Sequence, residues 1–169
     1  IGTAPLTPLT SLTINSASNV TFNSTVNAGF VLQTNSGSTG TTTFRENITT
    51  TVANGINITN GTINLDGLTM TAGTNAAALI RLNGNVTLTG GPANLYAIDD
   101  ITVTGTVSGA QNLTVQTSTA ATSEIQFQSN VGTTATPLGA ITIANGYDVT
   151  FGGNVSAASI TQDTGANST

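Results

Sequence analysis

Three-residue segments that read apolar, polar, apolar recur along the sequence, and they constrain the fold more than any other feature. Neighbouring segments commonly lie roughly 6 to 12 residues apart. They include Leu12-Thr13-Ile14, Val20-Thr21-Phe22, Ile56-Asn57-Ile58, Ile63-Asn64-Leu65, Leu68-Thr69-Met70, Val86-Thr87-Leu88, Ile101-Thr102-Val103, Leu113-Thr114-Val115, Ile125-Gln126-Phe127 and Ile141-Thr142-Ile143. Because successive side chains of a strand point to opposite faces, each segment places two apolar residues on one face. The sequence therefore predicts many short, half-buried strands.

Glycine-containing pairs separate many of these segments. They are Asn54-Gly55, Asn60-Gly61, Asp66-Gly67, Asn83-Gly84, Gly90-Gly91, Asn145-Gly146 and Gly152-Gly153. Glycine accepts the positive φ that tight turns require. No stretch of about a dozen residues repeats apolar positions at helical spacing, and Thr, Asn and Gly are poor helix formers. We therefore expect an all-β chain, and no change in composition marks a domain boundary.

Two arrangements are compatible with short strands and short turns. In an antiparallel β-sandwich or a filament-forming pilin-like fold, Asn-Gly pairs close two-residue hairpins. In a parallel β-helix, or β-solenoid, the same pairs form the bends between the strands of a coil. Three segments per coil give roughly 20 to 24 residues, which is typical of such repeats. We favour a single β-solenoid that covers residues 1–169, with the antiparallel folds as the alternative.

The low charge of the chain also favours a solenoid. Charged residues make up 5% of the sequence, against roughly 25% in ordinary domains. Stacked coils place equivalent side chains about 4.8 Å apart, where two like charges repel by about 0.9 kcal/mol even in water. Thr over Thr and Asn over Asn instead form favourable pairs. Apolar residues are 37% of the chain, which is enough apolar surface to argue against disorder.

The sequence also contains a long internal repeat. Eleven positions between Thr7 and Gly40 are identical 129 positions later, and the recurring segment Thr7 to Gln33 matches Thr136 to Gln162 without a gap. A shorter set, Gln33-Thr34, Phe44 and Asn47, recurs 83 positions later as Gln116-Thr117, Phe127 and Asn130. We therefore expect one 129-residue unit, about residues 7–135, followed by the start of the next at 136–169, within a longer array.

Composition excludes several classes of function. The chain has no His and no Cys, and its two cationic residues are Arg45 and Arg81. A nucleophile needs an adjacent base, and scattered carboxylates are the available bases, so we expect no enzyme, no catalytic residue and no cofactor. Two cations rule out a nucleic-acid footprint. The longest apolar run, residues 76–80, is too short for the roughly 20 residues of a membrane span.

Carboxylates and asparagines offer two kinds of candidate site. Asp99, Asp100 and Asp66 are the metal-ligand candidates, because carboxylate and carbonyl oxygens suit Ca²⁺. No calcium-loop motif is present, and a polar turn explains the Asp99-Asp100 pair better than a metal site. Nine Asn-x-Ser/Thr sequons begin at Asn19, Asn23, Asn47, Asn57, Asn60, Asn85, Asn112, Asn154 and Asn167. Glycosylation is one interpretation, and an Asn-hydrophobic-Thr strand opening is the other. Among the aromatic residues, Phe22 and Phe151 share a repeat position in an alternating segment and are expected in the core.

With these residues in view, the chain resembles the β-strand repeat regions of giant bacterial surface proteins, the filamentous-haemagglutinin-like and autotransporter-like adhesins. The resemblance rests on Gly40-Thr41-Thr42-Thr43-Phe44, on Thr-Pro-Leu at 7–9 and 136–138, and on the Asn/Gly-hydrophobic-Thr-hydrophobic segments. It implies a secreted, right-handed parallel β-helix that forms a stalk, fibre or surface layer. The resemblance assigns no catalytic residue to this chain.

We therefore expect an extracellular or cell-surface protein with a structural or adhesive function. Its partners would be neighbouring repeats or identical subunits, with host-surface or matrix glycans as further candidates. The alternatives are a filament subunit that exchanges strands between chains and a ligand-binding adhesin module. The absence of Cys agrees with an extracellular structure that does not depend on disulfides.

Overall fold

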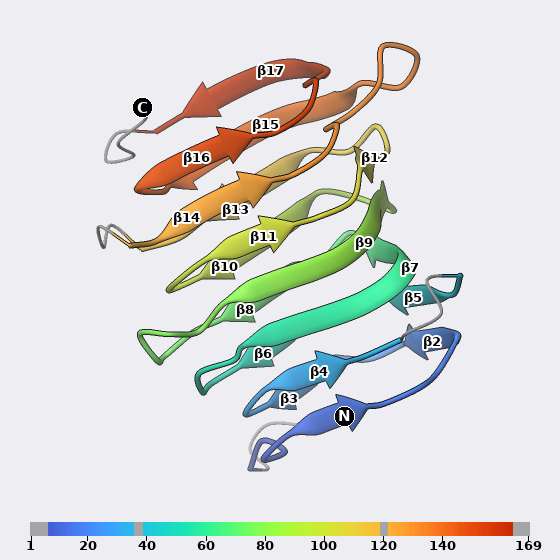
Figure 1. The fold of residues 1–169 in the computed structure, drawn as a ribbon, viewed down its shortest axis with the longest axis vertical. Coiled ribbons are helices and arrows are strands. Elements are labelled where there is room, and N and C mark those ends of the chain that lie inside the picture. The colour runs from blue at the N-terminus through green and yellow to red at the C-terminus, as the bar shows by residue number, and fades with distance from the viewer. Residues whose placement is uncertain (1–6, 36–38, 119–121, 164–169) are drawn as a thin grey trace.

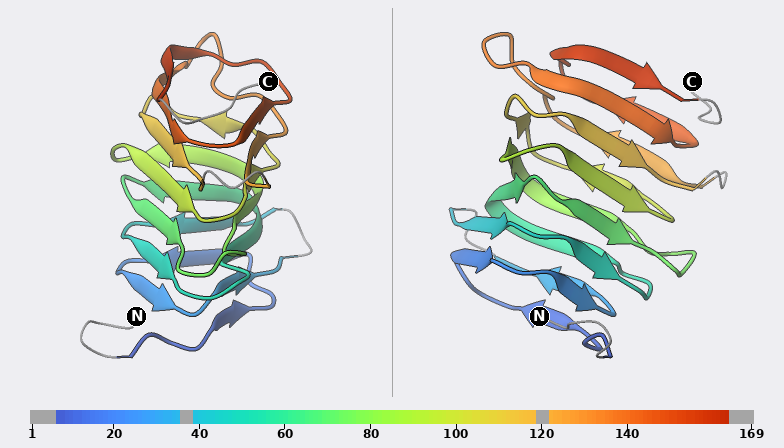
Figure 2. Two further views of the ribbon diagram at one scale, coloured as in Figure 1. Left: turned by 90° about the vertical axis from the view of Figure 1, so that its left-hand side faces the viewer. Right: turned by 180° about the vertical axis from the view of Figure 1, so that it is seen from behind.

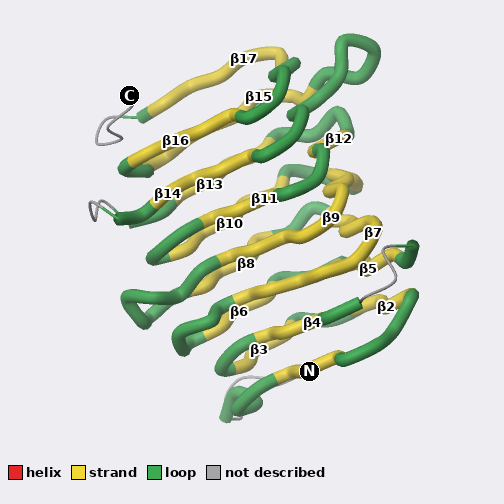
Figure 3. The backbone as a smooth tube through the Cα atoms, viewed as in Figure 1, coloured by secondary structure: helices red, strands yellow, loops and turns green. Residues whose placement is uncertain are grey.

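A computed structural model of the chain describes residues 7–35, 39–118 and 122–163. Every regular element in these ranges is a β-strand, and loops and turns separate the strands (Figure 3). The chain winds upward in Figure 1 from its N-terminal end to its C-terminal end, and each strand pairs in parallel with a strand of the next coil. The fold is the predicted all-β parallel β-solenoid, with about seven turns. The antiparallel alternative is wrong.

The strands form two sheets, which lie one in front of the other in Figure 1 and in the reverse order in the right view of Figure 2, seen from behind. The seven-stranded sheet contains, in order, β17 (Ala157–Gln162), β15 (Leu138–Asn145), β13 (Leu113–Gln116), β10 (Ala93–Ala97), β8 (Thr69–Ala72), β6 (Ile48–Thr50) and β3 (Val26–Ala28). The ten-stranded sheet contains β1 (Leu12–Ile14), β4 (Val31–Gln33), β7 (Ile56–Asp66), β9 (Ile80–Thr89), β11 (Ile101–Val103), β14 (Glu124–Phe127) and β16 (Asp148–Phe151), with β2 (Asn19–Phe22), β5 (Thr41–Phe44) and β12 (Val107–Ser108) beside this path.

The ten-stranded sheet covers two sides of the stack in its N-terminal part, because β7 and β9 are long enough to turn a corner. The pairing register between them shifts between Thr59 and Thr62, which is where the Asn60-Gly61 pair lies. Strands β4 and β11 pair with the first parts of these long strands, whereas β5 and β12 pair with the last parts. Asn60-Gly61 and Asn83-Gly84 are therefore corners within continuous strands and not hairpin turns.

Paired residues give the length of a coil directly, because each pair joins equivalent positions of neighbouring coils. The pairing of Leu12 with Val31 spans a short coil, and that of Gln116 with Asn145 spans a long one. Most pairings resemble that of Leu65 with Leu88 and fall between these extremes. The predicted coil of roughly 20 to 24 residues is confirmed.

The inward side chains form one continuous apolar core along the axis. Isoleucines and valines stack in register through successive coils, and many are fully buried. Phe22 stacks on Phe44 with ring centroids 4.8 Å apart, and Phe127 stacks on Phe151 at 5.2 Å. The prediction that Phe22 and Phe151 pack in the core is confirmed, with Phe151 only partly buried near the C-terminal end.

The outward side chains form the polar ladders expected of a charge-poor solenoid. Asn83 Nδ2 donates to Asn57 Oδ1 at 3.1 Å, one coil away. Asn94 Nδ2 donates to Thr69 Oγ1 at 3.3 Å in the other sheet. Neutral amides and hydroxyls can pair with their own kind at this spacing, whereas equal charges cannot.

Some segments of the 129-residue repeat lie in a different sheet from their copies. Leu12–Ile14 forms β1 of the ten-stranded sheet, whereas its copy, residues 141–143, lies in β15 of the seven-stranded sheet. The 83-residue repeat behaves in the same way, because Gln33 ends β4 and Gln116 ends β13. All sides of the coil accept the same alternating pattern, so a repeat need not return to the same side. The division into units 7–135 and 136–169 stays a prediction.

Candidate functional site

Asparagine side chains at or near the start of a paired segment bind the backbone of the next coil. Their Oδ1 atoms accept a hydrogen bond from a backbone N–H 21 to 28 residues further on: Asn19 from Thr41 (3.0 Å), Asn47 from Thr69 (2.9 Å), Asn85 from Thr106 (3.1 Å), Asn112 from Ala140 (2.8 Å) and Asn130 from Asn154 (2.9 Å). A backbone N–H at a strand end needs such an acceptor. Four of these asparagines begin sequons, so the sequon pattern has a structural cause. Asn167 lies outside the described residues.

Asn60 shows the same use of amides inside the corner of β7. Its side chain is buried, with Nδ2 donating to Thr42 Oγ1 at 2.9 Å and to the Ser18 carbonyl at 3.1 Å. Thr42 Oγ1 donates in turn to Gln33 Oε1 at 2.8 Å. The network ties three coils together and occupies the amide nitrogen of this sequon, so Asn60 is a structural residue in the folded chain.

The three carboxylates proposed as metal ligands lie at two different corners. Asp66 ends β7, where it accepts from Thr89 Oγ1 at 3.3 Å and faces Arg45 Nε at 4.0 Å. Asp99 and Asp100 precede β11, and Asp100 Oδ1 accepts from the Glu124 N–H at 2.9 Å. In the described part of the chain, no three acidic residues gather to form a metal centre. Calcium binding at Asp66 or at Asp99-Asp100 stays a prediction.

Burial, and then the charge of Asp100, raise the pKa of the Asp99 carboxyl above its ordinary value. Burial acts against the charged form, and a neighbouring negative charge does the same. The Asp99 N–H donates to the Ala78 carbonyl at 3.0 Å, so the turn is fixed to the preceding coil. The arrangement is a packed polar turn.

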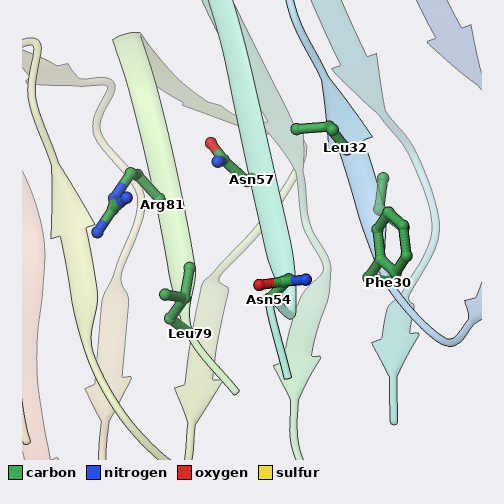
Figure 4. Close-up of a pocket in the computed structure, with 7 residues that line it drawn as sticks. Phe30, Leu32, Asn54, Asn57, Leu79 and Arg81 are labelled. Atoms are coloured by element: carbon green, nitrogen blue, oxygen red, sulfur yellow. The ribbon is translucent and has the colours of Figure 1, made fainter. Parts of the chain in front are cut away.

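A groove on the outer surface is the most developed candidate site. It has a volume of about 350 Å³ and is lined by Phe30, Val31, Leu32, Asn54, Asn57, Leu79 and Arg81. These residues come from three consecutive coils, at the start of β4, β7 and β9 (Figure 4). We call it the outer groove. A second hollow of about 310 Å³ lies near the C-terminal end and is lined mainly by uncharged polar residues between Asn130 and Ser156.

The two arginines differ in their surroundings. Arg45 Nη1 donates to Asn23 Oδ1 at 2.9 Å, and its Nε lies 4.0 Å from Asp66. Arg81 is exposed at the outer groove. Its side chain makes no hydrogen bond or ion pair with another residue of the described ranges. The outer groove therefore combines apolar side chains, two amides and an unpaired cation.

Sequence reasoning did not identify the outer groove. Phe30 is one of the isolated aromatic residues of the sequence, and its side chain is half-buried at the groove rather than in the core. A signal was present, because Phe30-Val31-Leu32 and Leu79-Ile80 break the alternation of apolar and polar residues. With Val31 and Ile80 buried, strand geometry must place Phe30, Leu32 and Leu79 on the outside.

The chain was compared with models of known protein families, with curated proteins and with solved structures, and none of them matches it. The resemblance to bacterial adhesin repeats therefore stays a hypothesis. No helix of the described residues is long and apolar enough to cross a membrane. What the geometry offers is a β-solenoid with laddered amides, an outer groove, and exposed apolar residues in the terminal coils.

Proposed function

We propose that this chain is a structural segment of an extracellular or cell-surface protein, and that it extends a fibre, stalk or surface layer by stacking coils. The observation that supports this proposal is the exposure of apolar residues in the terminal coils. Ile160 of β17 is 52% exposed, whereas its in-register partner Ile141 is fully buried. At the other end, Leu9 is 37% exposed, and Leu12 and Ile14 of β1 are only partly buried.

The terminal coils thus expose apolar residues at positions that are buried one coil further in, although Gln162 of β17 takes the position of the buried Ile143. Strand β17 pairs only with β15 among the described strands, so its other edge faces no strand of these ranges. An edge without a neighbouring strand favours pairing with another strand, and in a solenoid each added coil contributes one more interface. Another coil of the same kind meets this requirement best, whether it comes from a neighbouring repeat or from an identical subunit.

Sedimentation of the purified chain tests this proposal. We expect association that increases with protein concentration, and fibres or short rods by electron microscopy. Ile160→Lys places a charge at an inward position of the last coil and should abolish association. The matched control is Val52→Lys, because Val52 is an apolar residue 41% exposed on a loop between β6 and β7; it should associate like the original chain.

Two results would contradict the proposal. One is a chain that remains monomeric at millimolar concentration with β17 protected from hydrogen exchange. The other is association that Ile160→Lys leaves unchanged. The filament by strand exchange is distinguished by hydrogen exchange of β17 in the monomer, because an exchanged strand must first leave its own chain. Labelling of intact cells with an antibody against this segment tests the proposed location.

A further inference from the structure

We propose that the outer groove binds a sugar that carries a carboxylate, and that Arg81 is its anion-binding residue. The proposal is independent of whether the terminal coils assemble. The volume of about 350 Å³ lies at the lower end of the roughly 300–1,000 Å³ of small-molecule sites. Such sites combine apolar walls with a few polar groups that fix the ligand, which is the composition of this groove.

The charge of Arg81 defines the anionic part of the ligand. The chain has a net charge of −5 and two cations, and Arg45 is already engaged by Asn23 and Asp66. A guanidinium presents its N–H donors as a planar fork that matches the two oxygens of a carboxylate. No carboxylate of the described residues lies within ion-pair distance of Arg81.

The apolar residues define the other part of the ligand. Phe30 and Leu32 lie on one side of the groove, and Leu79 lies on the other, beside Arg81 (Figure 4). Flat apolar and aromatic surfaces of this kind pack against the C–H face of a pyranose ring. A purely ionic ligand such as inorganic phosphate would leave these side chains unused.

Two amides between these walls suit hydroxyl groups. Asn57 Oδ1 accepts from Asn83 Nδ2 at 3.1 Å, which orients the Asn57 amide and leaves its Nδ2 as a donor. Asn54 is exposed and has a φ of 76°. Among the described residues, no other residue except glycine has a positive φ. This is a common conformation of Asn in a tight turn, and it leaves the Asn54 amide at the groove.

The strand arrangement favours a sugar over an extended peptide. Peptides that bind sheets gain affinity from main-chain hydrogen bonds at a free strand edge. The groove crosses β4, β7 and β9, and each of these strands is paired on both sides. Side chains are therefore the groups that the groove offers, and a polyhydroxylated ring with one carboxylate uses all of them.

Calorimetric titration of the whole chain tests the proposal with defined probes. Trigalacturonic acid presents a uronate, 3′-sialyllactose presents a sialate, and lactose is the neutral control. We expect at least one acid to bind about tenfold or more tightly than lactose, and added salt to weaken it. Binding of one acid and not the other identifies which source of the carboxylate the groove accepts.

The matched variants are Arg81→Gln and Arg45→Gln, which remove the same charge at different corners. Arg81→Gln should weaken the acidic probe by about tenfold or more, Phe30→Ala should weaken acidic and neutral sugars together, and Arg45→Gln should leave binding unchanged. Thermal melts check that each variant is folded. The proposal is overturned if neither acid binds more tightly than lactose, or if the two arginine variants behave alike.

Discussion

Replacing Phe44 with Ala tests the inward assignment of the aromatic residues. Phe44 is fully buried and stacks on Phe22 with an interplanar angle of 2°. Truncating a buried Phe costs about 3–5 kcal/mol, of which about 0.5–1.5 kcal/mol reflects the ring pair. At about 2–4 °C per kcal/mol for a chain of this size, the melting temperature should fall by about 6 to 20 °C.

Phe30→Ala is the matched control because it deletes the same atoms from the outer groove. Phe30 is half-buried, so its loss should cost only about 1 kcal/mol. Phe151→Ala should fall between the two, because its ring stacks on Phe127 but is partly exposed. Scanning calorimetry measures all three. Equal decreases for Phe44→Ala and Phe30→Ala would refute the assignment of one ring to the core and the other to the surface.

Three further changes test the corners of the coils. A Cβ on Gly105 would lie 2.7 Å from the backbone nitrogen of Asn85, so Gly105→Ala should destabilise by about 1–3 kcal/mol in urea unfolding. Gly91→Ala, whose nearest new contact is at 3.5 Å, should be nearly neutral. Asn112→Ala removes the acceptor of a 2.8 Å hydrogen bond from the Ala140 N–H and should cost about 1 kcal/mol. Asn112→Asp keeps an acceptor and should be tolerated. Equal losses of stability in the two variants would contradict the role of the Asn112 side chain as that acceptor. Burial and a neighbouring carboxylate raise the Asp99 pKa in the fold, so the folded state holds this proton more tightly and stability falls as pH rises above about 3.9. Asp99→Asn should therefore be more stable than the original chain at neutral pH, and melts in acid should show the difference vanish below about pH 3.9.

The sequence alone predicted the class of the fold and the length of the coil. Alternation in segments such as Leu113-Thr114-Val115 depends only on the geometry of a strand, and the low charge reflects the close stacking of equivalent side chains. The core position of Phe22 followed from the same alternation. The outer groove was missed because it joins residues from three coils, and its members, such as Phe30 and Arg81, lie two coils apart along the chain.

Which side of the coil a segment occupies was decided only by the tertiary structure. Leu12–Ile14 and residues 141–143 have nearly the same sequence, yet they lie in different sheets. Period-two alternation states which side chains point inward, and it contains no information about which of the three sides the strand forms. That choice depends on how many residues form each corner, and this number varies from the short Asn60-Gly61 bend to whole loops. The sequence thus determined that the chain winds into stacked parallel strands, and the accumulated lengths of its corners determined which residues meet to form the outer groove.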